Sequence, residues 1–264
     1  MSRRLRTRTG SAVRDGGFSL MELMVTMFIM GMVVAATVSL TIGFERTNAE
    51  NVSRQDQIDS ARTAVEAMSK SLRTAVKPAQ LTSTCTFTFC TQYAFLQGTD
   101  FSVQFYANLN NSSNSIGPSR VTYTLVTTGP TAGQIIETIQ QADPDPDGPG
   151  PMPWPGSLGY TYCDATLGSA TTACKLRFST RPVAFGALAT TGKPMLKYYD
   201  AAGNQMSPVL SGGPLAVDQL GQVVSVEIVV TVQSTNVTKP NPTTYVQRVT
   251  LPNAQAVIRE TEEG

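Results

Sequence analysis

The sequence predicts an α+β fold in which a long N-terminal transmembrane and amphipathic helix packs on an antiparallel β-sheet domain. Three observations support this prediction: an uncharged apolar run near the N-terminus, a helical period that continues beyond it, and period-two runs in the rest of the chain. At 264 residues, the chain is long enough to bury a sizeable hydrophobic core. A helix followed by a series of strands is the order expected of an α+β protein.

The charged residues are distributed unevenly along the chain. The chain has 20 basic and 19 acidic residues, but residues 1–17 hold five arginines and a single acid, Asp15. The remainder has 15 basic and 18 acidic residues. We therefore expect a basic leader over residues 1–17. The mildly acidic remainder lacks the positive surface of a nucleic-acid-binding protein, so we expect no nucleic-acid partner.

Residues 23–44 form the apolar run, which contains no charge and no proline. As a helix this run would be roughly 33 Å long, enough to cross the hydrocarbon core of a bilayer. A cleaved secretory signal fits less well, because its apolar core would be shorter. The arginines precede the run, which predicts a single-pass protein of the cytoplasmic membrane with a cytoplasmic N-terminus and an extracytoplasmic C-terminal domain. We assign residues 18–44 to the transmembrane helix.

Helical periodicity continues through residues 45–77, which contain no proline or glycine. Apolar residues at steps of three and four lie on one face, and charged residues lie on the other. The apolar stripe consists of Ile58, Ala61, Val65, Met68, Leu72 and Val76. Pro78 is expected to end the helix, giving one element from about Phe18 to Val76 whose outer half packs on a sheet. A coiled-coil stalk is the weaker alternative, because the heptad-like run covers only about three repeats.

Residues 78–264 form the predicted β-rich extracytoplasmic domain. Alternating apolar and polar residues predict strands near residues 101–105, 121–125, 134–139, 223–232 and 245–251. The strongest pattern is Val223–Val232, and Tyr245–Leu251 is expected to be its antiparallel partner.

Four cysteines, Cys85, Cys90, Cys163 and Cys174, follow the membrane segment. An even number of cysteines outside the cytoplasm favours disulfides, and the local pairs Cys85–Cys90 and Cys163–Cys174 are the simplest of three possible connectivities. A four-cysteine zinc site would need more closely spaced pairs.

A proline-rich segment contains Asp143, Asp145 and Asp147 at alternate positions, the spacing found at the start of a calcium-binding EF-hand loop. Trp154 stands near the place where the loop's bidentate acid is expected, so these residues are a weak metal candidate. A stiff surface loop is the preferred interpretation. The chain has no histidine, which excludes Ser-His-Asp and Cys-His catalysis and histidine zinc sites. We expect a non-enzymatic protein with no cofactor.

The most specific motif surrounds Glu22, which lies at the rim of the apolar run in the segment GGFSLMELMV. An ionisable group at this depth is unfavourable unless it has a partner. Together with the basic leader, the motif resembles the prepilin-type cleavage and methylation signature of type IV pilins and type II secretion pseudopilins. The resemblance implies that a prepilin peptidase cuts between Gly17 and Phe18 and methylates the new amine of Phe18. It also implies that Glu22 pairs with the terminal amine of a neighbouring subunit during assembly.

The order of a helix followed by a sheet in that family agrees with the predicted fold. The amphipathic pattern of residues 56–76 is similar to that of minor pilins and J-type pseudopilins. The resemblance therefore implies a structural minor subunit of a type IV pilus or type II secretion-like filament. Its partners would be the prepilin peptidase, other pilin or pseudopilin subunits and the membrane assembly platform. Many major pilins have a proline in the first half of the apolar helix, and none occurs here before Pro78. A major pilin and a membrane-anchored binding or adhesion module are the alternatives.

Overall fold

The computed structural model describes residues 17, 19–81, 93–109, 117–142, 162–190, 192–207, 213–233 and 241–254. The chain divides into two compact units, Met1–Ala49 and Glu50–Gly264. Helix α1 (Leu20–Leu72) contributes residues to both units. In the first unit its side chains are exposed, and in the second its buried residues belong to the core of a β-sheet domain.

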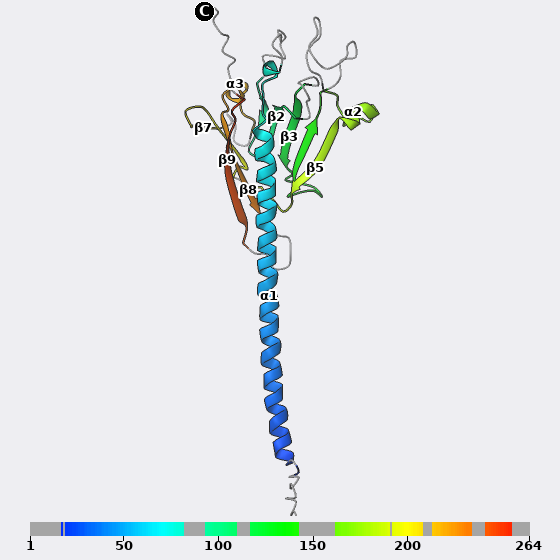
Figure 1. Cartoon of the computed structure of the whole chain (residues 1–264), viewed down its shortest axis with the longest axis vertical. Helices are drawn as coiled ribbons and strands as arrows, with labels where there is room; N and C mark the ends of the chain where they lie inside the picture. Colours follow the sequence, from blue (N-terminus) through cyan, green and yellow to red (C-terminus); the bar gives the residue numbers. More distant parts are fainter. Residues whose placement is uncertain are drawn as a thin grey trace, which may run out of the picture. The chain divides into compact units, whose positions relative to one another are not determined.

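The second unit contains two antiparallel sheets beside the C-terminal part of α1 (Figure 1). The first sheet has five strands in chain order: β1 (Phe95–Gly98), β2 (Ser102–Ala107), β3 (Ser119–Leu125), β4 (Ile135–Gln140) and β5 (Phe178–Ala184). The second has four strands in the order β7-β6-β8-β9: β7 (Gln205–Met206), β6 (Leu196–Tyr199), β8 (Ser225–Val232) and β9 (Thr243–Thr250). Short helices α2 (Thr172–Leu176) and α3 (Val217–Leu220) lie in the connections. The predicted α+β fold class is confirmed.

One hydrophobic core joins the helix to both sheets. Small and medium side chains of α1 are fully buried, so the helix backbone approaches the strands closely. The helix contributes Ala61, Ala64, Val65, Met68 and Leu72. The largest contributions from the sheets are Phe95, Phe105, Tyr123, Ile135, Leu196 and Ile228. Burial of this apolar area is the main favourable term for folding of the unit.

Two details of the predicted helix are wrong. Helix α1 ends at Leu72, and Pro78 instead starts a 3-10 helix, η1 (Pro78–Gln80). The chain leaves the helix before the proline because Ala75 forms an antiparallel bridge with Ala107, and the Val76 N–H donates to the Tyr106 carbonyl at 3.0 Å. Ile58 was predicted to lie in the apolar stripe, but its side chain is 40% exposed.

Candidate processing and assembly site

Helix α1 begins with a local capping arrangement. Ser19 directly precedes the helix, and the Glu22 N–H donates to the Ser19 carbonyl at 3.0 Å and to its Oγ at 3.3 Å. A serine hydroxyl that accepts from the third helical N–H satisfies one of the donors left unpaired at a helix start. Gly17 lies just before this cap and is exposed, whereas Phe18 lies outside the described residues.

Glu22 occupies the third position of α1 and is exposed. A carboxylate in the first turn interacts favourably with the positive end of the helix dipole. Ser19 and Glu22 also have the spacing of a capping box, in which serine and glutamate satisfy each other's backbone N–H groups. Sequence reasoning missed this local role, although the Ser-x-x-Glu spacing was available as a signal.

The helix beyond Glu22 presents apolar side chains on every face of the first unit. By length and composition, α1 is the one helix among the described residues that could cross a membrane. None of its most apolar window is buried inside the protein. The large exposed side chains in this run are Leu23, Met24, Val25, Met27, Phe28, Ile29, Met30, Met32, Val33, Val34, Val38, Leu40, Ile42 and Phe44. Such a continuous apolar surface needs lipid or other proteins around it.

The hydroxyl residues within the apolar run have local hydrogen-bond partners. The hydroxyls of Thr26, Thr37 and Ser39 each donate at 2.9 Å to a backbone carbonyl three or four residues earlier. The Thr41 hydroxyl donates in the same way to the Thr37 carbonyl. Because their donors are satisfied within the helix, these residues add little polar cost to burial in hydrocarbon.

A comparison with protein families bears on this segment. The family model of the prokaryotic N-terminal methylation motif matches residues 13–38. The chain carries a type IV pilin-like signature. The matched range includes Gly17, Phe18 and Glu22 and continues into the exposed apolar part of α1, so the signature and the described helix start coincide. No curated protein matches the chain at a significant level.

The pilin-like signature supports a structural protein that is anchored in the membrane by a single apolar helix. It also implies processing by a prepilin peptidase and assembly with other pilins. The roles of the individual residues Gly17, Phe18 and Glu22 stay predictions.

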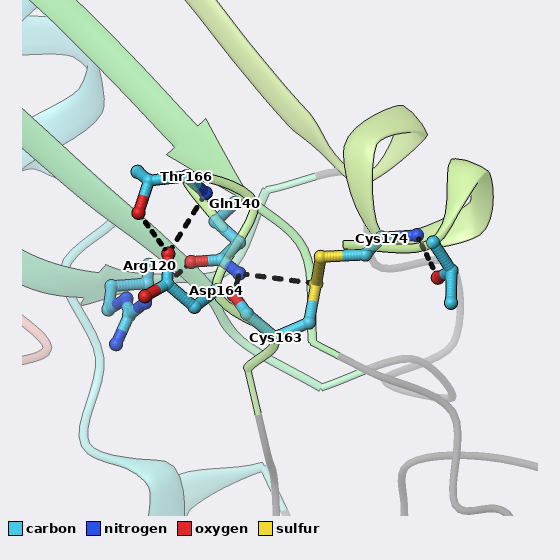
Figure 2. Close-up of a disulfide and its surroundings, with 7 residues drawn as sticks. Arg120, Gln140, Cys163, Asp164, Thr166 and Cys174 are labelled. Atoms are coloured by element: carbon cyan, nitrogen blue, oxygen red, sulfur yellow. Dashed lines mark hydrogen bonds between the residues drawn. A yellow bond between two sulfur atoms is a disulfide. The ribbon is translucent and has the colours of Figure 1, made fainter. Parts of the chain in front are cut away.

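Cys163 and Cys174 form a disulfide, which is one of the two local pairs favoured by the sequence. Figure 2 shows this bond joining the connection between β4 and β5 to helix α2, whose start is capped by the Thr171 hydroxyl accepting from the Cys174 N–H at 3.2 Å. The Gln140 amide donates to the Cys163 carbonyl, and Arg120 donates to the Gln140 Oε1 at 2.5 Å. The disulfide therefore closes this loop, and the Gln140 hydrogen bond holds the loop at the end of β4.

Asp164 adjoins the disulfide and organises the start of this loop. Its Oδ1 accepts from the Thr166 hydroxyl at 2.5 Å and from the Thr166 N–H at 2.9 Å (Figure 2). These two hydrogen bonds, the hydroxyl's first, hold the pKa of Asp164 below its ordinary value. The remaining predicted candidates, Cys85, Cys90, Asp143, Asp145, Asp147 and Trp154, lie outside the described residues.

Sequence reasoning also missed a buried polar network between α1 and the first sheet. Glu137 on β4 is 2% exposed, and its carboxylate accepts from the Tyr123 hydroxyl and from Arg181 Nε. The Tyr123 oxygen also lies 2.9 Å from Ser71 Oγ on α1. Burial, and after it the hydrogen bond to Glu137, raises the pKa of Tyr123. Both carboxylate oxygens are occupied, so we assign the network to packing.

Within the described ranges, no group of three or more histidine, cysteine, aspartate or glutamate residues could hold a metal ion. Among the described residues, the functional signal is the methylation motif, which includes the start of α1.

Proposed function

We propose that the chain is a structural minor subunit, a minor pilin or a pseudopilin, of a type IV pilus or type II secretion-like filament. The observation that carries the proposal is the methylation motif over residues 13–38, which coincides with the capped start of an exposed apolar helix. The lack of a proline before Pro78 and the large β-rich domain favour a minor subunit over a major one.

In this proposal, residues 1–17 are a leader that the arginines hold at the cytoplasmic surface of the membrane. A prepilin peptidase cuts after Gly17, where the missing side chain lets an extended backbone enter a narrow cleft. The new N-terminal amine belongs to Phe18 and is methylated. The sheet domain lies on the extracytoplasmic side.

Glu22 then has a partner in assembly. A carboxylate and an amine are each unfavourable in hydrocarbon, but an ion pair between them is tolerated. When the Glu22 carboxylate of one subunit meets the Phe18 amine of its neighbour, burial of both charges requires one axial register of the two helices. The apolar residues from Leu23 to Phe44 supply the packing surface between neighbouring helices.

Intact-mass measurement of the full chain, purified from membranes of a host with a prepilin peptidase, tests the processing step. We expect the mass of residues 18–264 plus one methyl group. The variant Gly17→Val should retain the leader, and Gly31→Val is the matched control because a Cβ at Gly31 meets no atom within 4 Å. A wild-type mass that still includes residues 1–17 would contradict the proposal and favour an uncleaved membrane anchor.

Copy number separates the two kinds of subunit. A minor pilin or pseudopilin should be present at a small fraction of the main filament subunit, as measured by quantitative mass spectrometry of sheared filaments. Filaments built mainly from this chain would instead identify a major pilin.

A further inference from the structure

Three of the four sheet edges in the described part of the chain are protected against pairing with another strand. Strand β1 has a register shift between Phe95 and Gln97, and its Gly98 carbonyl accepts from the Leu215 N–H at 2.8 Å. Strand β5 contains Pro182, which cannot donate, and is irregular beside it. Strand β7 has two residues. Proteins commonly use bulges, prolines, coverage and short strands to block edges.

Among the residues that the structure describes, strand β9 has none of these protections. It forms eight consecutive pairs with β8 without a register shift and contains no proline. The sequence TTYVQRVT is rich in residues with high β-propensity. Its side chains alternate between exposed positions and positions that are half-buried or, at Val249, buried, and Val246 is 56% exposed. A long regular edge of this kind is a template for another strand.

The hydrogen-bond pattern between β8 and β9 shows which backbone groups of β9 do not bond to β8. The Leu251 N–H donates to the Val224 carbonyl at 2.9 Å, so the odd-numbered residues of β9 exchange hydrogen bonds with β8. On the other side of β8, the Val229 N–H donates to the Met195 carbonyl at 2.7 Å, which agrees with this alternation. The backbone groups of Thr244, Val246 and Arg248 therefore point away from β8. They have no backbone partner among the residues that the structure describes.

A basic cleft lies beside this edge. It has a volume of about 210 Å³ and is lined by Glu66, Ser69, Lys70, Arg73 and Gln247. Glu66 is engaged by Arg62 Nε at 2.7 Å, whereas Lys70 and Arg73 have no acidic partner in the described part of the chain. The buried hydroxyl of Ser69 also lacks a hydrogen-bond partner there. The cleft therefore offers positive charge next to the free backbone groups of β9.

We propose that β9 accepts an extended acidic segment of a different protein chain as an added strand of the second sheet. The free N–H and C=O groups select an extended backbone. The cleft beside Gln247 selects a carboxylate on one face of the added strand, and the exposed Val246 selects an apolar side chain on the other. A second copy of this chain fits poorly, because antiparallel pairing of two β9 strands would bring the basic residues of both copies together.

The inference goes beyond the proposed filament role, because it concerns the Glu50–Gly264 unit and does not depend on cleavage of the leader. Fluorescence anisotropy with the full chain in detergent tests it. The probe is the labelled peptide Thr-Val-Glu-Val-Glu-Val-Thr, acetylated and amidated, whose glutamates and valines lie on opposite faces of a strand. We expect saturable binding. The same peptide with alternate backbone N-methylation, and the version with lysine for glutamate, should bind at least about tenfold more weakly.

Two protein variants test the two parts of the site. Val246→Pro removes an outward N–H that β8 does not use, and it should weaken binding about tenfold. Val246→Thr keeps the N–H and loses only part of the apolar contact, so it should weaken binding less than Val246→Pro does. Lys70 is an exposed residue in the last turn of α1, and Arg73 is exposed just after the helix ends. Charge reversal at these two residues should also weaken binding, with Arg54→Glu as the control. Circular dichroism checks folding of each variant. No saturable binding, or equal binding of the N-methylated peptide, would overturn the proposal.

Discussion

At the scale of single residues, the polar contacts of Tyr123 stabilise the packing of α1 on the first sheet. Its hydroxyl donates to the buried Glu137 carboxylate and lies 2.9 Å from Ser71 Oγ. We expect Tyr123→Phe to lower the free energy of unfolding by about 1–3 kcal/mol, because a buried carboxylate loses a donor. Urea unfolding of the full chain in detergent, followed by circular dichroism, measures the change. Tyr93→Phe, at an exposed position, is the control and should leave the stability unchanged.

The difference in stability between wild type and Tyr123→Phe should depend on pH. The pKa of Tyr123 is raised above its ordinary value of 10.0, mainly by burial, so the folded state binds this proton more tightly than the unfolded state. The stabilising contribution of the protonated Tyr123 hydroxyl is fully present below about pH 10 and is lost as the pH rises further. The stability gap between wild type and Tyr123→Phe should therefore shrink in alkaline solution. A gap that grows above pH 10 would contradict the assigned protonation.

The alternation in residues 121–125 places Tyr123 on the apolar face of its strand, but it does not identify the polar partners of its hydroxyl. Alternation places Glu137 on the same face of β4 as Ile135 and Ile139, so its burial follows from the period. The group that compensates its charge, Arg181, is 44 residues away and reaches it from β5. Such a pairing depends on the order of strands in the sheet. In contrast, Ser19 and Glu22 are three residues apart, so their contact could be predicted locally.

At the scale of elements, strands with clear alternation were predicted close to their observed positions. These are β2, β3, β4, β8 and β9, each with six to eight residues. The missed strands β1, β6 and β7 have two to four residues, too few to establish a period. Strand β5 was also missed, because it contains Pro182. A proline within a run argues against a strand unless that strand lies at the edge of a sheet.

The Cys163–Cys174 disulfide gives a prediction at this scale. The double variant Cys163→Ser/Cys174→Ser should lower the free energy of unfolding by about 2–3 kcal/mol, because the bond restricts the unfolded chain. Hydrogen exchange should also become faster in the enclosed loop, which includes the start of α2. Urea unfolding and hydrogen-exchange mass spectrometry measure the two effects. Ser169→Ala lies in the same loop on an exposed residue and should change neither.

At the scale of the whole molecule, the role of Glu22 can be separated from its local contact with Ser19. We expect Glu22→Ala to insert and be processed like wild type, but to enter filaments at least about tenfold less efficiently, because a buried amine loses its counter-charge. Glu22→Gln keeps a side chain able to complete the capping box but removes the charge, so it should show the same defect. Quantitative mass spectrometry of sheared filaments measures incorporation.

Glu50→Ala is the matched control for this experiment, since Glu50 is an exposed acid of α1 outside the apolar run. It should assemble normally. If Glu22→Gln assembled like wild type while Glu22→Ala did not, the local cap rather than the charge would explain the requirement.

The fold class and the start of α1 could be predicted from the sequence because both depend on local patterns: an apolar run, a helical period and alternating strands. The division of the strands into two sheets could not, because it depends on contacts between distant segments. Leu196 pairs with Ile228, for example, and Ile135 pairs with Ala184. The methylation motif is also local, which explains why functional residues were found there first.

The closed edges of β1, β5 and β7 have a consequence for stoichiometry. With β9 as the single open edge of the described sheets, the domain has a valence of one toward extended segments. A first segment would occupy the site and exclude a second. The domain would therefore bind its partner in a one-to-one ratio and end the sheet there, unlike an open strand stack that continues to grow by addition.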